Sequence, residues 1–175
     1  CVLKQRLGPR PRSAGRRRVP DLLRGGARRA GPGDIMILVR KRRALAGLVV
    51  ARLHAAGVPV ALHAITDGRD VAPDSAAGFV KDLAGWVDAL TDAAPVRIAT
   101  VIGRYYAMDR DTRWERVKTA YDAMIGGQGV AVAEDAVAAV EQSYDKGKSD
   151  EFIPATVVGD YAGVDKGAGF FCLNF

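Results

Sequence analysis

Two short apolar runs with a helix-forming segment between them limit the folds that are open to this chain. Residues 58–65 (VPVALHAI) and 96–102 (VRIATVI) are rich in β-branched residues and typical of strands that are buried on both faces. Residues 75–92 repeat apolar side chains every three or four positions, with Asp74 or Ser75 as the N-cap, which predicts a helix. A strand, a helix and a strand in this order favour a right-handed crossover and parallel pairing.

The same alternation continues along the rest of the chain. Further helices are predicted over residues 44–56, 114–125 and 134–146, each followed by a glycine that can end a helix in the left-handed conformation. Further strands are predicted over residues 155–158 and 169–175. We therefore predict an α/β fold, a parallel sheet in a three-layer domain with helices on both faces. A chain of 175 residues, 49% of them apolar, can bury the core of one such domain.

Several large side chains are expected to pack in this core. One face of the 75–92 helix carries Phe79, Leu83, Trp86, Val87 and Leu90. We also expect Trp114 to be buried, Tyr105 and Tyr106 to pack against their neighbours, and His63 to be a structural histidine within its apolar strand.

The first 43 residues do not share this pattern. They hold 14 Lys and Arg against two Asp, a net charge of +12, whereas residues 44–175 hold 12 against 18, or −6, which together give +6. The stretches RPRSAGRRR and RGGARRAGPG are rich in Arg, Gly and Pro and too poor in apolar residues to build a core. We therefore predict an irregular Arg-rich segment over residues 1–43 and the folded domain over residues 44–175.

Three interpretations of the Arg-rich segment stay open. An arm that binds nucleic acid or another polyanion would explain the charge, but its single Lys before position 41 and the acidic domain that follows disfavour it. A transit peptide would be richer in Ser, and only Ser13 is present. The third interpretation, which we favour, is translation in a shifted reading frame, because GC-rich DNA read out of frame gives this Arg, Gly, Pro and Ala bias.

Residue usage disfavours other classes of protein. No apolar run is long enough to cross a bilayer, so we expect no membrane contact. The cysteines Cys1 and Cys172 form no CxxC pair, which favours a reducing, cytoplasmic location without a disulfide framework or zinc ribbon. With His54 and His63 as the only histidines, no multi-histidine metal centre is expected in this chain. No Walker-type or GxGxxG loop stands between a strand and a helix, so nucleotide binding is disfavoured.

Charged loops follow both central strands and form the candidate site. The first is DGRD at residues 67–70, and the second, over residues 103–113, carries Arg104, Asp109 and Arg110. Neighbouring parallel strands end at the same edge of a sheet, so the loops should converge on one crevice. The arginine fork matches carboxylate and phosphate oxygens in pairs, which predicts a small ligand with two or three negative charges.

Aspartates between these arginines have two possible roles. They would hold the guanidinium groups in place, and one could accept a proton from a ligand. For either loop alone, the alternative is a solvated ion pair worth less than about 1 kcal/mol.

Four stretches resemble the substrate-binding domain of cofactor-independent phosphoglycerate mutase, in that family's order. They are HAITDGRDVAPDSA (63–76), IGRYYAMDRDTRWERVKTAYDA (102–123), YDKGKSDEFIPATVV (144–158) and GFFCLNF (169–175). The resemblance implies an isomerase of glycolysis and gluconeogenesis that interconverts 3-phosphoglycerate and 2-phosphoglycerate through a phosphoserine. By motif, it implies that Arg69, Asp70, Arg104 and Arg110 bind the substrate and that Asp70 moves protons on the glycerate hydroxyls.

The departures from the family are as informative. The family's R-x-D-R motif would follow residue 175, VRKRRALA at 39–46 stands in place of a GGVHSH-type segment, and neither the serine nucleophile motif nor the metal-ligand set is found. The resemblance places two manganese ions in an alkaline-phosphatase-like domain, so we expect this chain to bind no cofactor itself and to be inactive alone. Its expected partners are the phosphoglycerates and that domain, supplied in the same chain or in trans, in an enzyme that is usually monomeric.

A second hypothesis comes from another class of protein. In it, the chain is a non-catalytic binder of polyanions or nucleic acid that works through residues 1–43, and the acidic remainder argues against it.

Overall fold

The computed structural model describes residues 2–5, 18–21, 26–29, 42–90, 94–165 and 168–172, with side chains in 47–90, 94–165 and 168–170. In chain order the elements are β1 (Val2–Gln5), β2 (Arg18–Asp21), β3 (Gly26–Arg29), α1 (Arg42–Ala55), β4 (Val60–Thr66), α2 (Ala76–Asp88), β5 (Val96–Gly103), α3 (Arg104–Ala107), α4 (Trp114–Gly126), β6 (Ala131–Ala133), α5 (Ala136–Asp145), the 3-10 helix η2 (Asp150–Phe152), β7 (Thr156–Val158) and β8 (Gly169–Cys172).

The main sheet is mixed and has the strand order β6-β7-β5-β4-β1-β8, while β2 and β3 form a separate antiparallel pair. Strands β4 and β5 are parallel neighbours, in register from Val60 opposite Val96 to Thr66 opposite Gly103. Strands β6 and β7 are also parallel, whereas β7 runs antiparallel to β5 and β1 runs antiparallel to β4 and β8.

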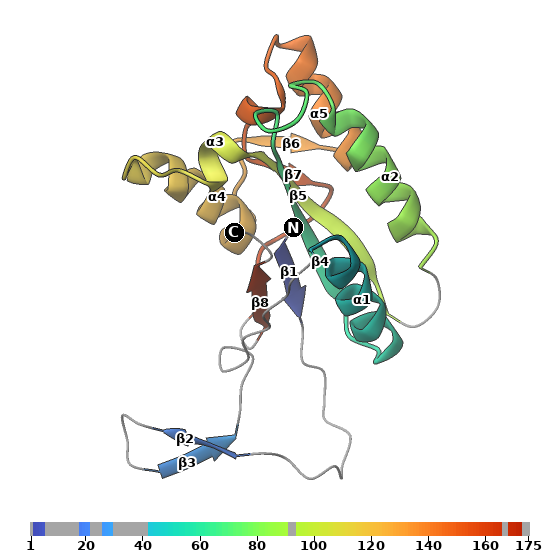
Figure 1. Cartoon of the computed structure of the whole chain (residues 1–175), viewed down its shortest axis with the longest axis vertical. Coiled ribbons are helices and arrows are strands. Elements are labelled where there is room, and N and C mark those ends of the chain that lie inside the picture. The colour runs from blue at the N-terminus through green and yellow to red at the C-terminus, as the bar shows by residue number, and fades with distance from the viewer. Residues whose placement is uncertain are drawn as a thin grey trace.

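The α/β class and the parallel pairing of the two central strands are confirmed. The sheet as a whole is mixed, because the chain after β5 passes through α3, α4, β6 and α5 before β7 enters beside β5 from the opposite end. Figure 1 shows α1, α2 and α5 on one side of the sheet and α3 with α4 on the other.

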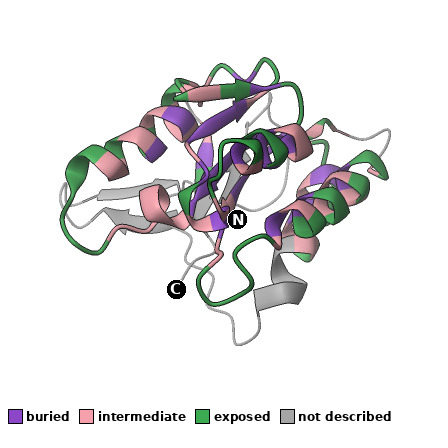
Figure 2. Cartoon of the chain, turned by 90° about the horizontal axis from the view of Figure 1, so that it is seen from above, coloured by how far each residue is buried: buried purple, intermediate pink, exposed green. Residues whose placement is uncertain are grey.

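Helices cover both faces of the sheet because successive side chains of a strand point in opposite directions. One cluster joins Val60 and Leu62 of β4 to Val50 of α1, Val80 of α2 and Val140 of α5. The other joins residues of β4, β5 and α4 to the loop after β7, namely Ala61, Ala99, Ala120, Ala123 and Tyr161. Figure 2 shows the buried residues gathered along the strands and the inner faces of these helices. The prediction of a three-layer domain is confirmed.

His63 lies on the α4 side of the sheet. Its ring is fully buried, its Nδ1 is 2.9 Å from Thr100 Oγ1, and its edge packs against the ring of Tyr161 at a centroid distance of 5.3 Å. The prediction of a buried structural histidine is confirmed.

Two large side chains that we expected in the core are exposed. Phe79 is 61% exposed and Trp114 is 71% exposed. In α2 the buried positions are Ala76, Val80 and Val87. The buried face of this helix is therefore narrower than the face that carries apolar side chains. In α4 the buried residues are Ala120 and Ala123. At 100° per residue, Trp114 lies about 180° around the helix axis from Ala123, on the opposite face.

Parts of the prediction fall outside the described residues. Within the Arg-rich segment, the described parts are β1, β2, β3 and the start of α1; its other residues lie outside the description, and the domain boundary at residue 43 stays a prediction. Residues 91–92 of the predicted 75–92 helix and 173–175 of the predicted last strand lie outside it as well. No helix in the described ranges has the length and apolarity needed to cross a bilayer.

Candidate functional site

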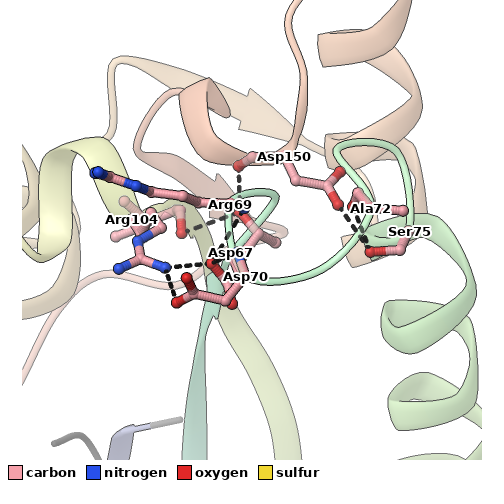
Figure 3. Close-up of polar contacts among 9 residues, drawn as sticks. Asp67, Arg69, Asp70, Ala72, Ser75, Arg104 and Asp150 are labelled. Carbon is pink, nitrogen blue, oxygen red and sulfur yellow. Dashed lines mark hydrogen bonds and ion pairs between the residues drawn. The ribbon is translucent and has the colours of Figure 1, made fainter.

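The charged loops converge at one edge of the sheet. Thr66 and Gly103 are partners in the β4–β5 register, and the chain continues directly from them into Asp67 and Arg104. Figure 3 shows the side chains of the first loop and of Arg104 gathered at this edge. The expectation that the two loops meet at one edge of the sheet is therefore confirmed, whereas a crevice between them stays a prediction.

Arg104 joins the two loops through ion pairs. Its Nη1 donates to Oδ2 of Asp70 at 2.7 Å and also to Oδ1 of Asp67. The Arg104 side chain is 15% exposed, whereas that of Asp70 is 74% exposed. Both carboxylates raise the pKa of Arg104, so its guanidinium stays charged. Within the described part of the chain only Nη1 is engaged, so Nε and Nη2 keep donors for a ligand.

Asp67 shapes the loop that carries the other residues. Its Oδ1 accepts from the backbone amides of Arg69 and Asp70, both at 3.3 Å, as well as from Arg104. Gly68 stands between them with a φ of +67°, a conformation that glycine adopts without steric cost. One carboxylate oxygen thus closes the turn and ties it to α3.

We expect acid to loosen this cluster only below the usual range for a carboxyl group. Partial burial by itself would raise the pKa of Asp67, but the hydrogen bonds from Arg104 and the two amides lower it below 3.8. A carboxyl with a lowered folded-state pKa stabilises the fold above its unfolded pKa, and this stability is lost as the pH falls through the folded pKa. An NMR titration of the Asp67 carboxyl should give a midpoint below 3.8, and Arg104→Ala should raise it. A midpoint that Arg104→Ala leaves unchanged would contradict this account.

The remaining two predicted site residues are placed less tightly. Arg69 is exposed in the first loop, and Figure 3 shows its side chain on the same side of that loop as the Arg104 guanidinium. Arg110 is exposed in the loop after α3 and forms no ion pair with another described residue. The structure thus joins Arg104 to Asp67 and Asp70 by direct contact. Arg69 belongs to the same loop as these two aspartates, whereas no hydrogen bond or ion pair among the described residues joins Arg110 to this cluster.

The second loop has its own buried carboxylate. The side chain of Asp109 is 2% exposed and accepts from the backbone amides of Asp111 at 3.2 Å and Arg113 at 2.8 Å. It also accepts from Nη1 of Arg116 at 3.4 Å, and the guanidinium of Arg116 lies 3.8 Å from the ring centroid of Tyr105. Asp109 therefore supports the loop of Arg110 rather than facing a ligand.

The two tyrosines of this region pack, as the sequence predicted. The ring of Tyr105 meets those of Tyr106 and Phe152, each at a centroid distance of 5.1 Å.

Asp150 is a residue of this region that sequence reasoning missed. It is fully buried in η2, and its Oδ2 accepts from the backbone amide of Ala76, the first residue of α2, at 2.8 Å. The two residues are 74 positions apart, so no local pattern could predict the contact. The one signal in the sequence is that Asp150 lies in one of the stretches that resemble the mutase family.

A cavity of about 300 Å³ lies beside the cluster, between the end of β4, the first loop and α2. Its walls are mainly apolar and include Ile65, Val71, Phe79 and Leu83, together with Asp67 and Asp150. Arg104 is not among its lining residues, so this cavity is not the anion site. Among the residues that the structure describes, no group of three or more His, Cys, Asp or Glu is placed to hold a metal ion.

Comparisons with known proteins agree on one family. Residues 42–175 match the family model described as BPG-independent PGAM N-terminus. Over 121 residues the chain is 62% identical to the 2,3-bisphosphoglycerate-independent phosphoglycerate mutase of Cereibacter sphaeroides strain ATCC 17025, covering 69% of this chain and 23% of that protein. The enzyme of the same name from Paracoccus denitrificans is 59% identical over 119 residues, covering 68% and 22%.

A solved structure gives the same result. The phosphoglycerate mutase of Leishmania mexicana, crystallised at low cobalt concentration, matches 61% of this chain and 21% of its own with a TM-score of 0.56 and 26% identity. The chain spans less than a quarter of the length of these relatives.

Proposed function

Because this chain belongs to the 2,3-bisphosphoglycerate-independent phosphoglycerate mutase family, we propose that the cluster around Arg104 binds phosphoglycerate within an isomerase that interconverts 3-phosphoglycerate and 2-phosphoglycerate. The observation that carries this proposal is the convergence of Arg104, Asp67 and Asp70 at the carboxyl ends of two parallel strands. The guanidinium of Arg104 is largely buried at this edge of the sheet and has donors left, which suits a ligand that has a carboxylate and a phosphate.

The proposed roles follow from exposure and chemistry. Ion pairs with Asp67 and Asp70 fix the guanidinium of Arg104. Its remaining donors can therefore bind an anionic oxygen without reorganisation. We propose that Arg69 and Arg110, which are both exposed, add positive charge with which the glycerate can stay bound while it turns. Asp70 is exposed beside Arg104 and can accept a proton from a glycerate hydroxyl and return it.

The phosphoryl chemistry is assigned to another part of the enzyme. We propose that it uses the serine nucleophile and two manganese ions of an alkaline-phosphatase-like domain, with which this domain acts as a monomeric, cytoplasmic glycolytic enzyme. The described residues offer no ligand set that fits a manganese ion, so no step is assigned to a metal here. The family match begins at residue 42 and gives no support to a polyanion binder that works through residues 1–43.

Isothermal titration with 3-phosphoglycerate tests the proposal. The wild-type chain should bind, and the double variant Arg104→Ala/Arg110→Ala should bind at least about tenfold more weakly, because each hydrogen bond to a charged group contributes roughly 1.5–3 kcal/mol. Arg97→Ala is the matched control, since Arg97 pairs with Asp160 near the start of β5, roughly 20 Å along the strand from Arg104. It should keep wild-type affinity. Identical heats from the wild type and the double variant would refute the proposal.

A further inference from the structure

A buried carboxylate outside the cluster meets three donors from two helices. Oδ2 of Asp150 accepts from the amide of Ala76 at 2.8 Å and from Oγ of Ser75 at 3.3 Å, and Oδ1 accepts from the hydroxyl of Tyr144 near the end of α5. Burial and the Asp150 carboxylate raise the pKa of Tyr144 to about 12, so this hydroxyl remains a donor at neutral pH. Donors from both helices compensate the buried charge.

The backbone of Asp150 holds the same loop at further points. Its amide donates to the carbonyl oxygen of Pro73 at 2.8 Å, and its carbonyl oxygen accepts from Oγ1 of Thr66 at 2.7 Å. Thr66 ends β4 and Ala76 begins α2, so one residue is bonded to both ends of the loop 67–75. A Cβ at Gly68 would lie 2.6 Å from the Cβ of Asp150, which shows how closely the loop rests on this residue.

At its α2 end the loop is also closed by Ser75, whose hydroxyl and amide donate to the carbonyl oxygen of Ala72 at 2.7 and 3.3 Å. Ser75, the N-cap residue of α2, makes no capping hydrogen bond with its side chain among the described residues, and the Asp150 carboxylate takes that place. An acceptor with a negative charge at a helix N-terminus is favourable both to the free amides and to the helix dipole. Loss of this acceptor would loosen the α2 end of the loop that carries Asp67 and Asp70, while the backbone bonds of Asp150 to Thr66 and Pro73 would remain.

We propose that Asp150 is a positioning residue for phosphoglycerate binding: it holds the loop 67–75 in the conformation in which Asp67 and Asp70 grip Arg104. This inference rests on the proposed function, because the affinity that it controls is that for phosphoglycerate. Asp150 itself does not touch the ligand. It acts through the loop, and removing its side chain raises the cost of ordering that loop when the ligand binds.

The test compares Asp150→Ala, Asp150→Asn and the control Asp135→Ala in the 175-residue chain. Asp135 caps α5 in the same way, with Oδ1 accepting from the amides of Val137 and Ala138 at 2.8 Å, and its side chain bonds no residue of the loop 67–75. Asp150→Ala should weaken 3-phosphoglycerate binding by about tenfold or more. Asp150→Asn can keep its oxygen toward Ala76 and should lose about threefold or less. Asp135→Ala should lower the unfolding free energy and leave the affinity unchanged.

A second readout separates this inference from the proposed function. Amide chemical shifts and hydrogen exchange of Arg69 and Asp70 should change in ligand-free Asp150→Ala and remain wild-type in Asp135→Ala. If the wild type does not bind 3-phosphoglycerate but these amides respond, the proposed function fails while the positioning role stands. Unchanged amides, or wild-type affinity in folded Asp150→Ala, would overturn the inference. If Asp150→Ala does not fold, Asp150→Ser, which also removes the carboxylate, carries the same comparison, and wild-type amides and affinity in it would overturn the inference.

Discussion

Gly103→Ala is expected to lower the free energy of unfolding by about 3 kcal/mol, the upper end of the usual cost of overpacking. A Cβ at this position would overlap the carbonyl oxygen of Glu151 and would lie 2.7 Å from both the carbonyl carbon of Glu151 and the nitrogen of Ile153. All of these are backbone atoms, so no side-chain rotation relieves the overlap. The amide of Gly103 also donates to the carbonyl oxygen of Ile153 at 2.8 Å, so β5 and this segment would have to separate.

Gly85→Ala is the matched control for the added methyl group. Gly85 lies inside α2, and no described atom lies within 4 Å of its Cβ position. Because alanine is the better helix former, this substitution should raise the free energy of unfolding by about 0.5–1 kcal/mol. Urea denaturation of both variants gives the two values. A cost below about 1 kcal/mol for Gly103→Ala would contradict the close approach between β5 and residues 151–153.

Among these glycine-to-alanine substitutions, Gly68→Ala should weaken ligand binding the most. Two penalties combine at this position: a φ of +67°, which costs an alanine about 1 kcal/mol, and a Cβ only 2.6 Å from the Cβ of Asp150 and 2.7 Å from the nitrogen of Glu151. Relief requires the loop to lift away from η2, which moves Asp67 and Asp70 from Arg104. We expect a loss of about 2–3 kcal/mol in stability and of about tenfold or more in 3-phosphoglycerate affinity.

Gly57→Ala isolates the conformational part of that effect. Gly57 has a φ of +70°, and no described atom lies within 4 Å of its Cβ position. Its substitution should cost about 1 kcal/mol and leave the affinity unchanged, because Gly57 precedes β4 at the end opposite the site. Equal losses of unfolding free energy for Gly57→Ala and Gly68→Ala, measured by urea denaturation, would show that the close approach of Gly68 to Asp150 adds nothing to the cost of the methyl group.

The parts of this fold that local patterns encode were predictable from the sequence. Strands β4 and β5 and helices α2, α4 and α5 lie within two residues of their predicted starts, because apolar periodicity and glycine stops mark them directly. The link between Arg104 and Asp70 was predictable for a related reason. Each follows one of two strands whose order already favoured parallel pairing, and such strands bring their following loops together.

Features that depend on distant partners could not be read in this way. Strand β6 has only three residues, and its pairing with β7 joins Ala131 to Thr156 across 25 positions. The burial of a helix face depends on the width of the surface it covers, so the apolar stripe of α2 did not reveal that Phe79 is exposed. The carboxylate that accepts from the first amide of α2 belongs to Asp150, 74 residues farther along the chain, whereas the neighbouring sequence predicts only Asp74 or Ser75 as the cap.

The long separation between Asp150 and the loop that it holds has a consequence for how this domain forms. The contacts of Asp150 with Thr66 and Ala76 span 84 and 74 residues, so the loop reaches its final geometry only after the chain has closed a large ring. Closing such rings is a slow, non-local event compared with forming a helix. On the ribosome, Asp67 and Asp70 are synthesised about 80 residues before Asp150, so we expect the nascent chain to expose this charged loop without its contacts to Asp150 until residue 150 has emerged and docked.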